Sequence, residues 1–531
     1  MGQMGFPVDI DFLRNNIELY KETFRKRGLD ENIVDKVIEL DNKRRELQRE
    51  LDKLRYKKNL LSKFYGSVIQ YLNGKIDRNT LIKAAIDIGY DIHEGNISEE
   101  LLNKLKEDIK DLDEEIKKEE EEFNNVENNL IDLLWNFPNL LSNEVPVGDE
   151  SKNTPVKFWG IPRVYDINLF KEQTERFGWR IVELNEILNN KEYEKYIKNR
   201  ELLEELNKIL NDEEDFKEIN FNDVLDFDKL NNDKIVVYKK VNHELKHQYD
   251  ILKEFNLADT DIAGEVSGSR FYFEFNILSL LDLSLSMEGV KYMINKGYTF
   301  TIPPYMLKKD ILDGIITLDD FADMMYKIDG EDLYLIGTAE HPITALYYNR
   351  IIEEDQLPIK IVGWSPCFRK EAGAHGKDTK GLFRLHQFHK IEQYIFCKPE
   401  DSEKYHKELI RNAEEFLEKL NIPYRTVIIA SMDMGKRNYK QYDIEGWFPG
   451  QNKYRELVSG SNVTDWQARR SNIRYRKKDN SLDYVHTLNC TLSAIQRTLT
   501  CIIENNYDYK NNRILIPGIL RQYIGKDFIT K

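Results

Sequence analysis

Residues 363–393 read GWSPCFRKEAGAHGKDTKGLFRLHQFHKIEQ, in which two apolar segments flank a loop rich in glycine, histidine and lysine. This pattern predicts a β-hairpin, because glycines let the loop turn tightly and approach a ligand closely. Alternate residues of a strand face the same side, so Arg369 and Glu371 are expected to project together into one cleft. The planar guanidinium of Arg369 can pair with an α-phosphate or with a substrate carboxylate.

The second strand of the predicted hairpin spans 382–396 and presents side chains of one parity to the same face. These are Arg384, His386, Phe388, Lys390 and Glu392. Further along the chain, a second polar cluster consists of Asn489, Thr491 and Arg497. Arginines, glutamates and an aromatic ring arranged in this way can hold a nucleoside triphosphate together with a small amino acid. The pattern therefore indicates amino-acid activation.

These residues resemble the motifs of the class II aminoacyl-tRNA synthetases, and within that class those of the seryl-tRNA synthetases. The first motif resembles residues 296–298 and 302–306, the second is 368–371 with its loop, and the third runs from 488 to 505. The serine-type signature Thr338-Ala339-Glu340 lies between the first two. The third motif departs from its bacterial form, where small residues are usual, at Cys490, Leu492 and Gln496. In these departures it resembles the archaeal and eukaryotic cytosolic form.

The resemblance implies ligands for individual residues. For serine, the matching positions are Thr338, Glu340, Arg369, Glu392, Asn489 and Thr491. For ATP, they are Arg369, Glu371, Arg384, Phe388, Glu456, Ser459 and Arg497. In the family, the counterpart of Phe388 stacks on adenine, and those of Arg384 and Arg497 hold the γ-phosphate. The counterparts of Glu456 and Ser459 hold Mg²⁺, so the resemblance implies Mg²⁺ with ATP, and Arg369, Glu456 and Arg497 are the catalytic candidates.

The resemblance also implies a fold and a reaction. The fold is α+β, with a class II antiparallel sheet flanked by helices, and the first motif implies a homodimer. The reaction joins L-serine and ATP into seryl-adenylate and then transfers serine to the 3′ end of tRNA(Ser). The first step needs alignment and charge neutralisation rather than a general base, because the carboxylate is already ionised. Glu392 and Thr491 are expected to select the hydroxyl, whereas threonine is rejected only by size, at about 1 to 3 kcal/mol per methyl.

Each motif alone has a structural explanation. An isolated Phe368–Glu371 is more often a surface strand with an ion pair, and Thr338-Ala339-Glu340 is also a good helix start. Two other functions stay open. One is a paralogue that activates serine or another small amino acid and loads an acceptor other than tRNA, which would lose a tRNA-gripping arm. The other is a coiled-coil interaction protein on an inactive fold, which would lose Arg369, Glu456 or Arg497, yet all three are present.

The composition sets outer limits. A chain of 531 residues with 41% hydrophobic residues is expected to hold more than one domain. The four cysteines show no metal-binding or secreted-type spacing, which indicates reduced thiols and no structural zinc. No apolar run reaches about 18 residues, so no membrane partner is expected and the predicted location is the cytoplasm.

The N-terminal part predicts a basic coiled-coil arm despite a net charge of -15. Residues 42–64 carry nine Lys or Arg against three acids, with leucines at intervals of seven from Leu40 to Leu61. A second apolar series over 102–133 predicts an antiparallel partner helix. In seryl-tRNA synthetases such an arm grips the tRNA. The candidate phosphate contacts are Arg44, Arg45, Arg49, Arg55, Lys57 and Lys58.

We divide the chain at its proline-rich connector. Residues 1–135 are the predicted helical hairpin with a tip insertion at 67–96, residues 136–160 a linker, and residues 161–531 the catalytic domain. Within the catalytic domain, about 161–239 reads as a helical, low-complexity and partly flexible insertion. The roles of the two insertions do not follow from the sequence.

Overall fold

The computed structural model describes residues 6–89, 99–317, 324–371, 378 and 380–531. The described chain divides into two compact units. One unit consists of Phe6–Arg25 and Leu29–Phe137, and the other includes Lys26–Gly28 and Pro138–Lys531. Among the described helices, none is long and apolar enough to cross a membrane.

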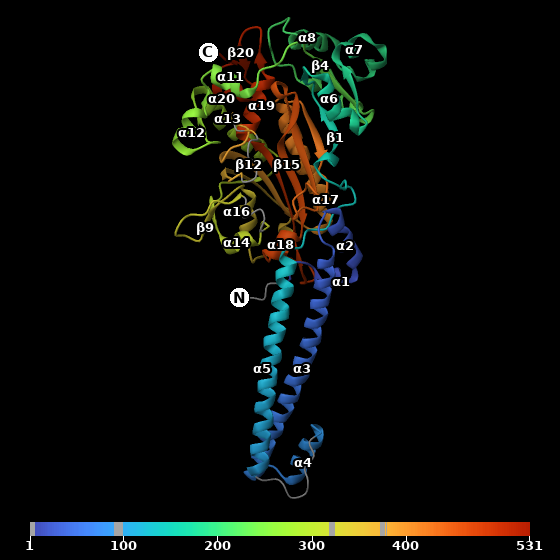
Figure 1. Ribbon diagram of the computed structural model, residues 1–531, viewed down its shortest axis with the longest axis vertical. Helices are drawn as coiled ribbons and strands as arrows, with labels where there is room; N and C mark the ends of the chain where they lie inside the picture. The colour runs from blue at the N-terminus through green and yellow to red at the C-terminus, as the bar shows by residue number, and fades with distance from the viewer. Residues whose placement is uncertain (1–5, 90–98, 318–323, 372–377, 379) are drawn as a thin grey trace. The chain divides into compact units, whose positions relative to one another are not determined.

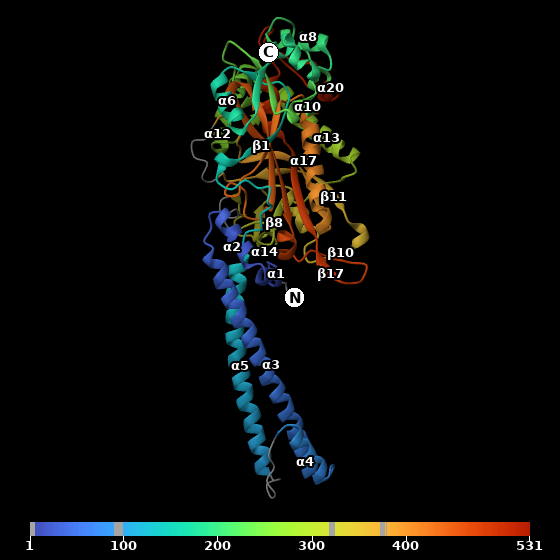
Figure 2. The same cartoon turned by 90° about the vertical axis from the view of Figure 1, so that its right-hand side faces the viewer.

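The N-terminal unit is built on two long helices. These are α3 (Asn32–Leu72) and α5 (Glu99–Trp135), accompanied by α1 (Ile10–Asn15), α2 (Ile17–Lys26) and α4 (Arg78–Asp87). Ion pairs set their direction, since Arg55 bonds Glu120 at 2.7 Å and Lys58 bonds Asp113 at 2.5 Å. Later residues of α3 therefore face earlier residues of α5, which makes the hairpin antiparallel, as Figures 1 and 2 also show.

The seam between the two helices follows the predicted heptads. Val37, Leu47, Leu51 and Leu61 are buried in α3, opposite a buried series on α5 that includes Leu112. This confirms the predicted coiled coil, because apolar side chains repeating at this interval have only the partner helix to cover them. Within the predicted tip insertion, α4 forms a short helix, and residues 90–96 lie outside the described part.

The centre of the second unit is an eight-stranded sheet (Figure 1). In spatial order the strands are β1 (Thr154–Trp159), β13 (Tyr424–Ile428), β14 (Lys440–Phe448), β15 (Lys453–Thr464), β18 (His486–Ala494), β12 (Gln387–Cys397), β11 (Ile359–Phe368) and β7 (Thr299–Thr301). Neighbours are antiparallel except β11 and β7, which run parallel. The predicted α+β fold with an antiparallel sheet is confirmed.

Three helices pack on this sheet and complete the core. They are α13 (Asn276–Asn295), α17 (Ser402–Lys419) and α19 (Ile495–Asn505). α13 crosses the sheet so closely that a Cβ at Gly289 would lie 2.4 Å from Cδ1 of Ile391. A side chain at this position would therefore displace the tip of Ile391.

Shorter elements surround the sheet. The strands are β5 (Ala258–Asp259), β6 (Phe273–Glu274), β8 (Met306–Lys308), β9 (Leu333–Leu335), β10 (Ile351–Glu353), β16 (Arg474–Arg476), β17 (Leu482–Tyr484), β19 (Tyr507–Asp508), β20 (Arg513–Leu515) and β21 (Phe528–Ile529). The helices are α11 (Gln248–Glu254), α12 (Asp261–Ser267), α14 (Lys309–Asp313), α16 (Glu340–Ala345), α18 (Trp466–Arg470) and α20 (Gly518–Ile524).

Residues 161–239 differ from the helical insertion expected from the sequence. They contain a small parallel sheet of β2 (Arg163–Val164), β4 (Ile235–Lys240) and β3 (Arg180–Glu183), with helices α6 (Ile167–Thr174), α7 (Leu184–Asn189), α8 (Arg200–Leu210), α9 (Phe221–Val224) and α10 (Phe227–Asn232). The strands are short apolar runs, which helical and strand periodicity do not distinguish. Leu203 and Val224 are fully buried, so this segment has a packed interior.

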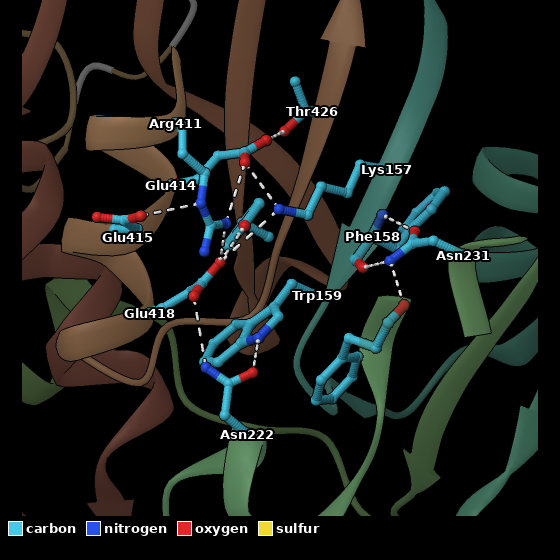
Figure 3. A network of polar contacts seen from close by, with 12 residues as sticks. Lys157, Phe158, Trp159, Asn222, Asn231, Arg411, Glu414, Glu415, Glu418 and Thr426 are labelled. Atoms are coloured by element: carbon cyan, nitrogen blue, oxygen red, sulfur yellow. Dashed lines mark hydrogen bonds and ion pairs between the residues drawn. The ribbon is translucent and has the colours of Figure 1, made fainter. Parts of the chain in front are cut away.

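A polar network fastens this segment to the main sheet (Figure 3). Lys157 of β1 bonds Glu414 of α17 at 2.7 Å. On the neighbouring side, the indole N–H of Trp159 donates to Asn222 at 2.9 Å, and Asn222 in turn donates to Glu418 of α17 at 3.4 Å. Because these contacts join β1, α17 and the segment around α9, they hold the segment in the same compact unit as the large sheet.

Candidate active site

The sequence-predicted site residues come together around one cavity on the large sheet, with a volume of about 290 Å³. Its lining includes Thr338, Glu340, Arg369, Glu371, Phe388, Glu392, Glu456, Ser459, Asn489, Thr491 and Arg497. Arg384 is not one of the lining residues, but it bonds the lining residue Glu371 at 2.7 Å. Residues more than a hundred positions apart in the chain thus share one cavity.

The two strands of the hairpin are shorter in the structure than the sequence predicted. β11 ends at Phe368 and β12 begins at Gln387, so Arg369, Glu371 and Arg384 lie outside the strands. The backbone of Glu371 has a φ of 51°, which lies in the left-handed region rather than in the extended region of regular strands. Of the predicted loop 373–381, residues 373–377 and 379 lie outside the described residues. Arg369 nonetheless faces the cavity, where its Nε donates to the carbonyl oxygen of Gly337 at 3.1 Å.

The prediction of one functional face holds within β12. Phe388, Lys390 and Glu392 alternate along the strand and all three line the cavity. Glu392 lies opposite Thr491 in the pairing of β12 with β18. Its Oε2 is 2.5 Å from Nζ of Lys390 and 3.4 Å from Oγ1 of Thr491. Burial raises the pKa of Glu392, and the ammonium of Lys390 acts against that rise.

The signature Thr338-Ala339-Glu340 forms the start of α16. The backbone N–H of Glu340 is 3.2 Å from the Thr338 hydroxyl, and the Glu340 side chain is buried in the cavity wall. Both its oxygens accept from the guanidinium of Arg437, and Gln467 donates to Oε1 at 2.8 Å. Burial would raise the pKa of Glu340, but Arg437 and the neighbouring His341 hold it below its usual value.

The other end of the cavity is rich in arginine. The guanidinium of Arg369 lies 5.3 Å from the ring centre of Phe388. Arg497 donates from Nε to the carbonyl of Phe383 at 3.0 Å, and its Nη1 lies 3.2 Å from Glu456. These two guanidiniums and the half-buried ring of Phe388 suit a polyanion that carries a flat base.

The residues assigned to Mg²⁺ offer suitable ligands. Glu456 supplies a carboxylate and Ser459 a hydroxyl, both hard oxygen donors at the cavity wall. Asp443 lies beside them, and burial together with Glu456 raises its pKa well above the usual value. In the described part of the chain, no three His, Cys, Asp or Glu residues cluster as a metal site of their own. The donor set fits a Mg²⁺ ion that reaches the site with phosphate oxygens.

Sequence reasoning missed the cavity wall formed by the segment between β13 and β14. Asp433, Arg437 and Asn438 of this segment line the cavity, and so does Gln441 near the start of β14. No motif marks these residues, and the ion pair of Arg437 with Glu340 joins positions 97 apart in the chain. Lys390 was predicted to share the face of β12 but not to bond Glu392.

The fold and the site together define a class II aminoacyl-tRNA synthetase. Residues 325–506 match the family model of the tRNA synthetase class II core domain (G, H, P, S and T), and residues 8–102 match that of the seryl-tRNA synthetase N-terminal domain. The serine–tRNA ligase of Sulfolobus acidocaldarius is 42% identical over 97% of this chain and 94% of its own length. That of Hyperthermus butylicus is 39% identical with the same coverage.

Solved structures agree with these relatives. Seryl-tRNA synthetase from Pyrococcus horikoshii complexed with ATP has a TM-score of 0.78 at 35% identity and covers 98% of this chain and 99% of its own. The cytoplasmic enzyme of Naegleria fowleri in complex with AMP has a TM-score of 0.74 at 30% identity, covering 99% of each. The chain belongs to the seryl-tRNA synthetase family, whose members are ATP-dependent ligases. This confirms the archaeal and eukaryotic resemblance predicted from the third motif.

Proposed function

We propose that the chain activates L-serine with ATP and transfers it to the 3′ end of tRNA(Ser). The observation that carries the proposal is the cavity itself, where two buried carboxylates, Glu340 and Glu392, lie on the same wall as Arg369 and Phe388. One end suits a small ammonium-bearing, hydroxyl-bearing substrate and the other suits a nucleotide. Membership of the family supports this function over the two alternatives.

In the first step, a serine carboxylate oxygen attacks the α-phosphorus of ATP and the bond to pyrophosphate breaks. Arg369 neutralises charge at the α-phosphate, and Arg384 and Arg497 hold the γ-phosphate. Phe388 stacks on adenine, with Glu371 as a further ATP contact. Glu456 and Ser459 are the residues that would hold Mg²⁺, and the bound ion would supply positive charge to neutralise the leaving pyrophosphate.

Serine recognition rests on the opposite end of the cavity. Glu340 and Thr338 receive the substrate's ammonium, and Asn489 lies beside them as a further contact. Glu392 and Thr491 meet the hydroxyl. A substrate without the hydroxyl would leave these buried polar groups unpaired, which gives strong rejection of alanine.

The first test is serine-dependent ATP–pyrophosphate exchange without tRNA. We expect exchange with serine and at least about 100-fold lower kcat/KM with alanine and glycine, because their complexes leave Glu392 and Thr491 unpaired. Threonine is expected to be the nearest competitor. Faster exchange with another amino acid would contradict the roles given to Glu392 and Thr491.

The basic face of α3 is proposed to bind the tRNA backbone. Of the six candidates, Arg44, Arg55 and Lys58 pair with acidic residues of α5. Arg45, Arg49 and Lys57 are exposed, and no ion pair joins them to another residue in the described part of the chain. These three are therefore the better candidates for phosphate contacts. The other three stabilise the helical hairpin through their ion pairs with α5.

Replacing Arg45 and Arg49 together by alanine should weaken tRNA charging about tenfold at moderate salt and leave exchange unchanged, since two phosphate contacts are lost. The slope of log K for tRNA against log salt should fall by about two. The matched control is Arg55→Ala with Lys58→Ala, which removes the same charge from paired positions. A larger loss of charging in the control would refute the assignment.

A homodimer through the first motif is also proposed. The support is an apolar stripe on α13, where Leu280, Leu283, Met287 and Ile294 are exposed at helical spacing. Phe300 and Ile302, in and just after edge strand β7, add to it. An exposed apolar surface of this kind is typical of a subunit interface.

The division at residues 136–160 and the cytoplasmic location also stay proposals. All four cysteines are free and buried, which suits a reducing compartment.

A further inference from the structure

The segment between β13 and β14 forms the wall of the amino-acid end of the cavity. Its residue Arg437 bonds both oxygens of Glu340, the carboxylate proposed to receive the substrate's ammonium. Oε1 of Glu340 already accepts from Arg437 and from Gln467, whereas among the described residues Oε2 accepts only from Arg437. A carboxylate oxygen accepts two hydrogen bonds, so this arrangement leaves room on Oε2 for one further donor.

This wall is held from behind by one buried guanidinium. Arg27 donates to the carbonyl oxygens of Met434 at 3.5 Å, Gly435 at 3.2 Å and Asn438 at 2.6 Å. These carbonyls bracket Arg437 in the chain. Burial lowers the pKa of Arg27 to about 9. A buried cation is costly, and in the described part of the chain the side-chain hydrogen bonds of Arg27 go to carbonyl oxygens rather than to a carboxylate.

The residues on either side of Arg27 contact the same segment. The carbonyl oxygen of Lys26 accepts from the Ser431 hydroxyl. Gly28 has a φ of 68°, and a Cβ there would lie 2.9 Å from Cε of Met432. Three consecutive residues, Lys26 to Gly28, thus contact the segment between β13 and β14. Asn139 contacts it as well, donating from its side chain to the carbonyl oxygen of Arg437 at 2.9 Å.

We propose that Arg27 is a positioning residue for serine binding, which fixes the segment 434–438 so that Arg437 bonds Glu340 and leaves Oε2 able to accept a second hydrogen bond, from the substrate's ammonium. The inference rests on the proposed function. Arg27 itself does not line the cavity, so it acts through Arg437.

The primary test compares KM values in ATP–pyrophosphate exchange. Arg437→Met should raise KM for serine about tenfold and change KM for ATP less than twofold, because a charge-assisted pair on Glu340 is lost. Arg27→Ala should do the same. If Arg27 acts through Arg437, the double variant should match Arg437→Met alone, whereas independent effects would multiply to about 100-fold. Arg27→Lys keeps the charge and should recover part of the loss.

A pH profile gives a readout that a general loss of stability would not move. Without Arg437, the buried Glu340 would have a raised pKa and would be protonated at low pH. The charged and titratable groups around it are Arg437, His341, Lys390, Glu392, Arg369 and Tyr394. His341 has a pKa lowered to about 3 by burial, so it does not titrate near neutrality. KM for serine should therefore fall from pH 6 to 8 more steeply in Arg437→Met than in the unmodified chain.

The matched control is Arg163, a second buried arginine that donates hydrogen bonds to backbone carbonyl oxygens. It donates to Glu504 at 3.3 Å, Asn505 at 2.9 Å and Tyr507 at 3.5 Å, and it does not line the active-site cavity. Arg163→Ala should lower Tm without a selective change in KM for serine.

The proposal is overturned if Arg27→Ala shifts both KM values equally, if its effect multiplies with that of Arg437→Met, or if Arg163→Ala gives the same serine effect. Should Arg27→Ala fail to fold, Arg27→Lys and its double variant with Arg437→Met decide by the same comparison. Absence of serine-dependent exchange in the unmodified chain would instead refute the proposed function. Exchange that is intact, with KM for serine unchanged by both Arg27 variants, would refute only this inference.

Discussion

The substitution Arg369→Ala is expected to lower serine-dependent ATP–pyrophosphate exchange by at least about 100-fold. A loss of this size is usual when a donor that stabilises charge in the transition state is removed. Arg369 lies over Phe388 and bonds Gly337, so its guanidinium is fixed in the cavity before substrates bind. The loss should appear mainly in kcat, because the charge on the α-phosphate develops during the reaction.

The neighbouring residue supplies the control. Lys370 is exposed and does not line the cavity, so Lys370→Ala removes one positive charge from the same turn and should leave exchange within about twofold. Arg369→Lys should recover little, because an ammonium lacks the planar fork. Exchange above a tenth of the unmodified rate in Arg369→Ala would show that another cation neutralises the α-phosphate.

The double substitution Leu283→Glu and Met287→Glu is expected to convert the proposed dimer to a monomer. Leu283 is 62% exposed and Met287 58% exposed in the single chain. In a twofold dimer each substitution enters the interface twice, and buried unpaired carboxylates cost several kcal/mol. We expect the dissociation constant to rise by more than about 1,000-fold, measured by sedimentation or light scattering over a concentration series.

Val156 offers a comparison on the opposite edge strand of the sheet. It is 46% exposed on β1, so Val156→Glu adds one negative charge, against two in the double variant, to an apolar surface position on the edge strand opposite β7. This variant should remain a dimer. Dissociation by both changes alike would mean that net charge rather than the α13 stripe controls assembly.

The sequence predicted the parts of the molecule whose residues are close in the chain or repeat regularly. The heptads of α3 and α5 fixed the coiled coil, because burial of a repeating stripe leaves few other arrangements. The face of β12 followed from alternation at Phe388, Lys390 and Glu392. The ends of the hairpin strands did not, since the left-handed backbone at Glu371 has no sequence signal beyond a charged residue before a loop.

The residues that local patterns cannot find are those joined only by the fold. Arg437 meets Glu340, and Arg27 meets a segment more than four hundred positions away. Each is an ordinary arginine among many in a chain with 78 lysines and arginines. The small sheet of β2, β4 and β3 was missed for another reason, because apolar runs of a few residues fit both helix and strand.

The placement of Lys26–Gly28 limits how this protein can be cut. These three residues belong to the compact unit that continues at Pro138, although the chain on both sides of them belongs to the other unit. A fragment that begins at Pro138 would lack the guanidinium that serves the carbonyls of Met434, Gly435 and Asn438. Cutting the enzyme just before Pro138 therefore does not separate its two compact units cleanly. If the helical hairpin is replaced or shortened, Lys26–Gly28 must be retained so that the second unit keeps these hydrogen bonds.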